Sequence, residues 1–357
     1  MTSSESSIEE EVSPNIHDVA RIAGVSTSTV SRSFRNPTKL SDKTRRHVND
    51  VARKLNYRPR TEAAAAARKA ELPLDPSNVI GFHFFSDSTL GPEMNAFYAP
   101  MLAAVQMEAE RLGLSMLLGT SSRFTLSDRL PRMIGDKLVG GLLLVSTPDE
   151  PVLDAFRECV PHIVMLDNMD VTGKYTSIRS DGFRGTYEAV TYLFRLGHRQ
   201  IGFVRCKGDS SLDDRFYGFV AAHVDAGHAF DERFVLNASA GRRVVEPAVK
   251  LLENPLRPTA IIGGNDAYAL DVMDACRHLG LRVPDDLSVI GFDDIDSGRR
   301  SVPALTTMSV KKEQMGRLAV RRLLREMRGQ SEDEMFPVEI RVGVDLVKRE
   351  SCRRLDR

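Results

Sequence analysis

The chain has 357 residues, of which 42% are hydrophobic, and a formal net charge of zero at pH 7. It is longer than the roughly 250 to 300 residues at which a single hydrophobic core stops growing, so several domains are expected. The sequence has no apolar run long enough to cross a membrane and no signal-peptide pattern at its start. Its widely spaced cysteines argue against a disulfide framework or a thiolate metal site; they are Cys159, Cys206, Cys276 and Cys352. We therefore expect a cytoplasmic protein without a metal, a cofactor or a membrane attachment.

The zero net charge conceals a basic segment near the N-terminus. Residues 14–72 carry 13 Lys and Arg against 5 Asp and Glu, whereas residues 1–13 carry 4 Glu and no basic residue. A basic segment on an otherwise mildly acidic protein is typical of nucleic-acid binding. Residues 1–13 are predicted to be a disordered acidic leader.

Two short helices are predicted within residues 16–34, and Gly24 separates them. Asn15 and Asp18 have the spacing of a capping box, and Ser26 is a natural N-cap for the second helix. Neither helix can be stable alone, because isolated helices become marginal in water only at about 12 to 15 residues. Each helix must therefore bury a face against the other.

A third helix is predicted to begin after Ser41 and to end near Tyr57, which closes a helix-turn-helix domain over residues 14–59. The second helix keeps its short hydroxyls and one guanidinium outward, where they suit phosphates and base edges in a DNA major groove. The predicted DNA-binding residues of this domain are Thr27, Ser28, Ser31, Arg32, Asn36, Lys43 and Arg45. The alternative is a solvated polar face without a partner, which the positive charge of the segment disfavours.

Residues 60–77 are predicted to be a hinge helix and linker. Their first part, RTEAAAAARKA, favours a helix but is too short to be helical alone. We expect it to order only when two copies meet on DNA, and a plain flexible linker is the alternative.

From residue 78 onward, short apolar runs alternate with amphipathic segments. Predicted strands are VIGFHFF (79–85), LSMLLG (114–119), GGLLLVS (140–146), HIVMLD (162–167), QIGFVRC (200–206), TAIIGG (259–264) and LSVIGF (287–292). Predicted helices cover residues 98–112, 183–196, 213–226, 266–279 and 312–328. This alternation predicts an α/β fold with buried parallel strands, in two consecutive sets that would form two lobes.

Polar residues follow several of these strands, at the edge where open α/β sheets bind ligands. Asp167 ends one strand, Asn265 follows a second, Asp293 follows a third, and Arg215 opens a predicted helix. A carboxylate and a guanidinium can each bind two neighbouring hydroxyls, so this set suits a polyol such as a sugar. For Asn265, and for the nearby Asp294, the alternative is a structural role as a helix cap.

Four segments of the chain together resemble one family of proteins. They are IHDVARIAGVSTSTVSRSFRN…LSDKTRRHVNDVARKLNYRP, RLGHRQIGFV, PTAIIGGNDAYALDVMDACRHLGLRVPDDLSVIGFDDID and LTTMSVKKEQMGRLAV. In this order they resemble the lactose-repressor (LacI/GalR) family of bacterial transcription regulators, over residues 16 to about 351. The resemblance implies an N-terminal DNA-binding headpiece and an effector-binding core similar to type I periplasmic sugar-binding proteins.

The resemblance also implies a division of the core, residues 78–357, and a set of ligand contacts. The implied lobes are residues 78–178 with 311–337, and residues 179–310 with 338–357. The implied effector-binding residues are Phe97, Tyr98, Arg215, Asn265 and Asp293, to which we add Asp167 from its place at a strand end.

The sequence departs from the family pattern at several positions. It has no aromatic residue in LNASAGRR to stack on a sugar ring, Val310 replaces a frequent Gln, and a longer loop over residues 87–96 precedes Phe97. A nucleoside, a cyclitol or a phosphorylated metabolite therefore stays open beside a sugar. In the hinge, Ala66 stands where the family has a DNA-wedging Leu, so we expect weaker bending of DNA or a different docking of the hinge.

A small headpiece offers few base contacts, so specific binding is expected to need a homodimer that reads two half-sites on operator DNA. Helices 98–112 and 266–282 are the implied dimer faces, and the tail lacks the leucine heptads of a coiled-coil tetramer. A small-molecule effector that prefers one arrangement of the lobes would then change operator affinity, and release of a repressor is the commoner outcome in the family.

A transport receptor and an enzyme are the other classes of protein compatible with such a core. A solute-binding receptor of a transport system would need an export signal and would not carry a basic headpiece. An enzyme would need a motif such as GxGxxG, GxxxxGK[ST], GxSxG or HExxH, and none of these occurs. We therefore predict a DNA-binding regulator that is not an enzyme.

Overall fold

The computed structural model describes the chain in two compact units, residues 1–74 and 75–357. The described residues are 15–35, 40–55, 57, 75–85, 92–121, 130–145, 150–206, 210–239, 242–329 and 336–355. The predicted acidic leader, most of the predicted hinge, Asn36 and Ala66 lie outside them.

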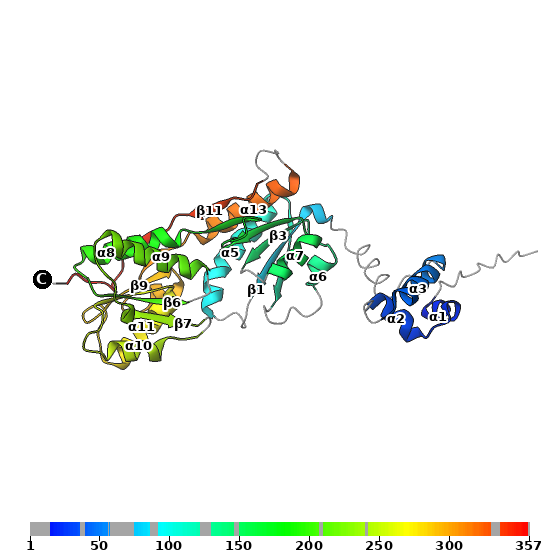
Figure 1. Ribbon diagram of the computed structural model, residues 1–357. Helices are drawn as coiled ribbons and strands as arrows, with labels where there is room; N and C mark the ends of the chain where they lie inside the picture. Colours follow the sequence, from blue (N-terminus) through cyan, green and yellow to red (C-terminus); the bar gives the residue numbers. More distant parts are fainter. Residues whose placement is uncertain are drawn as a thin grey trace, which may run out of the picture. The chain divides into compact units, whose positions relative to one another are not determined.

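The N-terminal unit contains three helices, α1 (Ile16–Ala23), α2 (Thr27–Arg35) and α3 (Asp42–Lys54) (Figure 1). The capping box predicted for α1 is present: the Asn15 side chain accepts from backbone N–H groups at the start of the helix, and Asp18 accepts from the Asn15 N–H at 3.0 Å. Gly24 ends α1 with a left-handed φ of 61°, where glycine pays no steric penalty. One small core joins the three helices, and its buried residues are Val19, Ala20, Ala23, Val30, Val48, Val51 and Ala52.

The second unit contains two six-stranded sheets, which Figure 1 shows side by side. The first has the order β11-β5-β4-β3-β1-β2, and all its pairs are parallel. Its strands are β1 (Val79–Phe85), β2 (Ser115–Ser121), β3 (Gly141–Val145), β4 (His162–Leu166), β5 (Thr176–Ser180) and β11 (Glu339–Val342). The helical elements of the lobe built on this sheet are η2 (Pro76–Asn78), α5 (Pro92–Arg111), α6 (Arg132–Gly135), α7 (Glu150–Cys159) and α13 (Lys312–Arg328).

The second sheet has the order β12-β10-β9-β8-β6-β7, and β12 runs antiparallel to β10 at one edge. Its strands are β6 (Ile201–Cys206), β7 (Val235–Ala238), β8 (Ala260–Gly263), β9 (Ser288–Asp293), β10 (Thr306–Ser309) and β12 (Asp345–Val347). The helical elements of the lobe built on this second sheet are α8 (Gly182–Arg195), α9 (Ser210–Asp225), η3 (Glu232–Phe234), α10 (Val245–Leu252), α11 (Asp266–His278) and α12 (Asp296–Arg300).

The chain passes between the two sheets three times: after β5, after β10 and after β11. The first and third passages are joined by the Asp181 N–H, which donates to the Val342 carbonyl at 2.9 Å. Because β11 pairs with β5, the first sheet extends to residue 342, and the predicted return to the second lobe at residue 338 is too early. The backbone pairing of the short EIRV segment, which carries no continuous apolar run, decides this boundary.

The long apolar runs give strands close to the predicted bounds, because buried parallel strands need apolar residues on both faces. The shorter and more polar strands β5, β7, β10, β11 and β12 were not predicted, nor were α7 and α10. Helix α5 begins at Pro92, so part of the predicted loop over residues 87–96 is helical.

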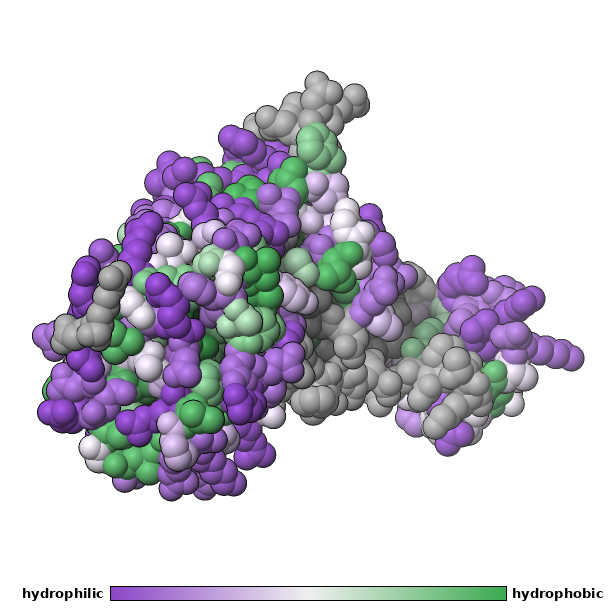
Figure 2. Space-filling view, turned by 60° about the vertical axis from the view of Figure 1, so that its left-hand side comes forward, coloured by the Kyte–Doolittle hydropathy of each residue, from purple (hydrophilic) through white to green (hydrophobic). Residues whose placement is uncertain are grey.

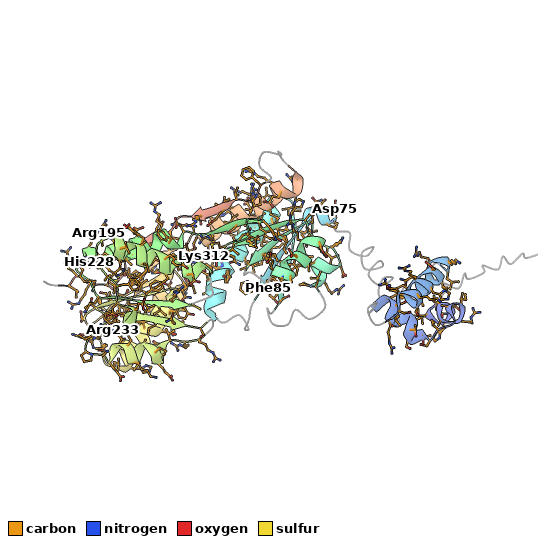
Figure 3. All side chains as sticks on the ribbon, viewed as in Figure 1. Asp75, Phe85, Arg195, His228, Arg233 and Lys312 are labelled. Carbon is orange, nitrogen blue, oxygen red and sulfur yellow. The ribbon has the colours of Figure 1, made fainter. Side chains whose placement is uncertain are left out.

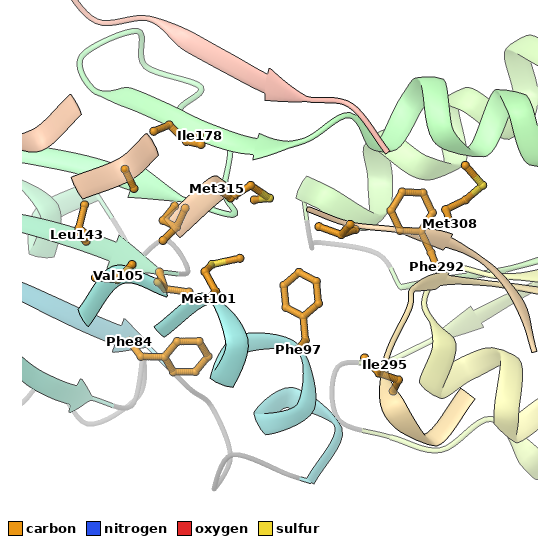
Figure 4. Packing of buried hydrophobic residues seen from close by; sticks show 14 of the residues in the cluster. Phe84, Phe97, Met101, Val105, Leu143, Ile178, Phe292, Ile295, Met308 and Met315 are labelled. Carbon is orange, nitrogen blue, oxygen red and sulfur yellow. The ribbon is translucent and has the colours of Figure 1, made fainter. Parts of the chain in front are cut away.

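One hydrophobic cluster includes buried residues of both sheets and of helices α5, α8, α9 and α13. Figure 4 shows Phe97 of α5 and Met101 on one side of this cluster, with Ile295 and Phe292 on the other. On the face shown in Figure 2, hydrophilic side chains predominate among the coloured residues, and apolar ones form small groups. No helix among the described residues is long and apolar enough to span a bilayer.

Candidate functional site

The predicted DNA-binding side chains that the structure describes lie on α2 and α3 of the first unit. Ser26 caps α2, since its Oγ accepts the Thr29 N–H at 3.2 Å. Ser28 and Arg32 are exposed, whereas Thr27 and Ser31 are half-buried. The helix therefore packs its apolar face on the core and turns its polar face outward, an arrangement that fits a helix that binds in a DNA groove.

The two basic residues predicted on α3 differ in their surroundings. Lys43 is exposed, and Arg45 forms an ion pair of 3.0 Å with Asp42 on the same helix. The Asp42 carboxylate partly neutralises Arg45, so Lys43 is the better candidate for a phosphate contact.

In the second unit, Arg215 and Asp293 meet at the carboxyl end of β9. The Arg215 Nη2 lies 2.9 Å from Asp293 Oδ1, and its Nη1 donates to the Gly264 carbonyl at 2.6 Å. The guanidinium also lies 3.8 Å from the ring centroid of Phe292. Arg215 is only 3% exposed, and its Nε makes no hydrogen bond within the described part of the chain. A buried donor without an acceptor is costly unless water or a ligand satisfies it.

The sequence pattern did not single out Lys312, which holds the backbone of this site. Asp293 and Asp294 have φ angles of 110° and 56°, a region that costs a non-glycine residue about 1 to 3 kcal/mol. The buried ammonium of Lys312 donates to both of their carbonyl oxygens and lies 5.5 Å from the Phe97 ring centroid. Figure 3 shows Lys312 at the start of α13, where the two sheets adjoin. A lysine in the first turn of a helix interacts unfavourably with the helix dipole. This unusual position is the feature of the sequence that could have identified Lys312.

Replacing Lys312 with methionine is expected to lower the free energy of unfolding by about 2 to 3 kcal/mol, because two carbonyls lose a charged donor. The neighbouring Lys311→Met is the matched control, since Lys311 is more exposed and pairs with Asp345 at the surface. Urea denaturation of both variants makes the comparison. Equal losses for the two variants would show that Lys312 has no special place in this site.

The first lobe contributes Tyr98 and Asp167. The Tyr98 hydroxyl donates to Asp167 Oδ2 at 2.8 Å, and its ring packs edge-on against Phe97 and Phe84, with centroids 4.8 and 5.0 Å away. Asp167 follows β4 with a left-handed φ of 57°, and its N–H donates to the Ile178 carbonyl. The predicted residues of this lobe therefore lie together, with an aromatic face beside a carboxylate.

The structural alternatives for Asn265 and Asp294 have different outcomes. Asn265 Oδ1 accepts the Tyr268 N–H at 2.9 Å, so Asn265 does cap α11. Asp294 makes no capping hydrogen bond to α12, the described helix that follows it, and instead forms ion pairs with Arg299 and Arg349 at 2.9 and 2.6 Å. Burial alone would raise the pKa of Asp294, but the two guanidinium groups outweigh it and lower the pKa to about 2. Asp294 is therefore a charged anchor beside the site.

Asp266 is a fully buried carboxyl next to this anchor. It accepts from the Thr307 hydroxyl at 2.5 Å and from the Ile295 N–H at 2.8 Å. Burial and the neighbouring Asp293 raise the pKa of Asp266 to about 7. Among the residues that the structure describes, no group of three or more His, Cys, Asp and Glu side chains is arranged to hold a metal ion.

Comparison with known proteins covers both units. A family model of bacterial regulatory proteins, lacI family, matches residues 15–60, and a model of the periplasmic binding protein-like domain matches residues 190–352. The chain is 31% identical over 346 residues to the HTH-type transcriptional repressor PurR of Escherichia coli O139:H28, covering 94% of this chain and 96% of PurR. It is 28% identical over 330 residues to the HTH-type transcriptional repressor CytR of Escherichia coli K12, covering 90% and 92%.

Solved structures give the same result. The lac repressor dimer bound to operator and the anti-inducer ONPF has a TM-score of 0.63 at 27% identity, over 95% of this chain and 99% of that one. A complex of the transcriptional regulator CelR with cellobiose has a TM-score of 0.66 at 23% identity over the same shares, which shows the fold. These relatives are transcriptional regulators. The chain belongs to the LacI family of bacterial regulatory proteins and is a DNA-binding transcription regulator under allosteric control by a small molecule.

Proposed function

We propose that the chain is a repressor whose operator affinity is switched by a polyhydroxylated metabolite bound between the two lobes, at Arg215 and Asp293. The observation that carries this proposal is the buried Arg215–Asp293 pair, with an Arg215 Nε that has no acceptor in the described part of the chain. A ligand can take the place of Asp293 as the partner of Arg215, and the place of Arg215 as the partner of Asp293. The guanidinium and the carboxylate can then each bind two adjacent hydroxyls of that ligand.

The first lobe would supply the other side of the ligand. The Tyr98–Asp167 pair offers a hydroxyl and a carboxylate, and Phe97 offers an apolar face. Asn265 uses its side-chain oxygen to cap α11, so its amide group is the part that can donate to a ligand. A sugar, a cyclitol or the ribose of a nucleoside fits this donor and acceptor set.

On DNA, we propose that Thr27, Ser28, Ser31 and Arg32 face the major groove and that Lys43 binds phosphate. The basic charge of residues 14–72 supports this assignment. A ligand that prefers one arrangement of the lobes would change operator affinity roughly 5- to 150-fold, for a coupling free energy of 1 to 3 kcal/mol. Such a protein would act in the cytoplasm, where operator DNA lies.

Two experiments test this function. Selection of genomic fragments by the full-length protein should yield a preferred sequence with two half-sites. A thermal-shift screen with D-ribose, cellobiose, myo-inositol and cytidine should then raise Tm for at least one compound, since a ligand that binds only the folded state stabilises it. A screen in which none of these compounds binds would remove the polyol class.

We further propose that α5 contributes to a homodimer. Met107 on this helix is 69% exposed, and Leu118 on the neighbouring edge strand β2 is 58% exposed. Met107→Asp is expected to shift the protein toward monomer in analytical ultracentrifugation, because a carboxylate in an apolar interface loses its hydration. The control is Val224→Asp, since Val224 on α9 is similarly exposed but lies outside the proposed interface. A dimer unchanged by Met107→Asp would place the interface elsewhere.

A further inference from the structure

We propose that the ion pair between Arg179 and Asp214 positions Arg215 by tying the helical turn that carries it to the first lobe. Effector affinity then depends on how the two lobes are arranged. This inference rests on the proposed function of Arg215 as an effector-binding residue.

Near the start of α9 lie three consecutive charged residues, Asp213, Asp214 and Arg215, and each is paired with a different strand. Asp213 Oδ1 accepts from Arg205 of β6 at 2.6 Å, and Arg215 pairs with Asp293 of β9 at 2.9 Å. Both of these partners belong to the second sheet. Asp214 Oδ2 instead lies 2.9 Å from Arg179 Nη1, and Arg179 belongs to β5 of the first sheet. Of the three pairs, the middle one alone joins the lobes.

The Arg179 guanidinium is buried between two carboxylates. Arg179 is 1% exposed, and its Nε donates to Glu339 Oε1 of β11 at 2.6 Å. Burial alone would raise the pKa of Glu339. The two guanidinium groups of Arg179 and Arg341 outweigh this effect, so the pKa is lowered and the carboxylate stays ionised. A buried charge that loses its partner is strongly destabilising, so the lobes cannot separate at this point without a large free-energy cost.

Asp214 is also fixed to the passage between the sheets. Its Oδ2 accepts the Phe183 N–H at 2.9 Å, in the first turn of α8 directly after that passage. At Gly182, a Cβ would lie 3.0 Å from Arg215 Cγ and 3.1 Å from Asp214 Oδ2, so the glycine lets these side chains approach the crossing chain. Arg215 and the interlobe pair thus pack on the same backbone.

This arrangement has a consequence for ligand binding. A ligand that displaces Asp293 from Arg215 acts on a helical turn that is held, one residue earlier, from the other lobe. A pair that only stabilised α9 could come from within the second lobe, as Arg205–Asp213 does. The interlobe pair transmits a change at Arg215 to β5 and β11.

Hydrogen exchange of the full-length protein without ligand tests the tie. Asp214→Asn keeps an oxygen for the Phe183 N–H and removes only the charge, and Arg179→Met leaves Glu339 with Arg341. Either variant should speed exchange by at least about tenfold in both the first turns of α9 and the amides of β5 and β11. The double variant should be no worse than the worse single one. If Arg179→Met does not fold, Arg179→Lys, which keeps the charge but not both contacts, takes its place.

Asp213→Asn is the matched control, because it makes the same change in the same turn but breaks a pair within one lobe. It should leave exchange of β5 and β11 within about twofold of the unaltered protein. Additive effects of the two single variants, or an Asp214→Asn effect confined to α9, would overturn the proposal. So would an Asp213→Asn effect on β5 equal to that of Asp214→Asn.

Thermal shift with D-ribose, cellobiose and cytidine separates this inference from the proposed function. A compound that binds should lose about tenfold in affinity with Asp214→Asn and little with Asp213→Asn. Equal losses for the two variants would overturn the positioning role of the pair. If no compound binds the unaltered protein, the proposed ligand class fails, while the exchange data still decide whether the pair ties the lobes.

Discussion

Replacing Arg215 with methionine is expected to abolish the effector response and to lower the free energy of unfolding by about 3 to 5 kcal/mol. The change removes a guanidinium partner of Asp293, a carboxylate that is 9% exposed, and the donor to the Gly264 carbonyl. A buried carboxylate that loses a guanidinium partner cannot recover its hydration, so the loss exceeds that of a surface pair. Urea denaturation measures the stability, and thermal shift with the compounds named above measures the response.

The control for Arg215→Met is the same substitution at Arg233. Arg233 forms a contact of 2.5 Å with Asp231, but its side chain is 72% exposed, and solvent screens such a pair. Arg233→Met should leave both Tm and the ligand response close to those of the unaltered protein. An Arg215→Met variant that kept full stability and a full ligand response would refute the assignment of the effector site.

Arg32→Ala is expected to weaken binding to the selected operator and also to relax the choice of bases at one position. A bidentate contact from arginine to guanine is worth about 1 to 3 kcal/mol of discrimination against the wrong base. Arg32 is exposed on α2, whose capped first turn and buried Val30 fix its direction. Fluorescence anisotropy with operator variants substituted at each position measures the preference.

Lys43→Ala serves as the counterpart of Arg32→Ala. A phosphate contact carries no base information, so this variant should weaken all sequences alike and reduce the slope of log K against log salt by about 1. If Arg32→Ala weakened all sequences alike while preserving base preference, Arg32 would be a phosphate contact instead.

Much of the fold follows from local patterns in the sequence. The Asn15–Asp18 capping box specifies α1, and the seven apolar runs specify six buried strands and the edge strand β2, because caps and parallel sheets have strict residue requirements. Strands such as β5 (TSIRS) and β11 (EIRV) have no such signal. Their polar residues are accommodated by long-range ion pairs, Arg179–Asp214 and Arg179–Glu339, which only the tertiary structure creates.

The sequence predicted which residues form the candidate site, but it predicted only part of how they are arranged. The structure joins Asp293 and Asp167, which lie at strand ends, to Arg215 of α9 and Tyr98 of α5. It also shows that Asn265 caps α11, which was the structural alternative given for this residue. Asp294 instead forms an ion pair with Arg349, and a partner so distant in sequence could not be predicted from a local pattern. The proposed roles of Asn36 and Ala66 stay predictions, because both residues lie outside the described part of the chain.

The weak-bending hypothesis for the hinge has a direct test of its own. A methyl group cannot unstack a base step as an isobutyl group can, so the chain should bend operator DNA less than an Ala66→Leu variant does. Circular-permutation gel-shift assays compare the two proteins. Equal bending by both would mean that residue 66 does not set the kink.

Operator binding by the full-length protein, measured by fluorescence anisotropy with and without a bound metabolite, tests the central claim most directly. We predict a genomic fragment that binds at least tenfold more tightly than competitor DNA, with an affinity that the metabolite changes by roughly 5- to 150-fold, and only while Arg215 is intact. A protein that binds every fragment equally, whatever metabolite is present, would contradict the account.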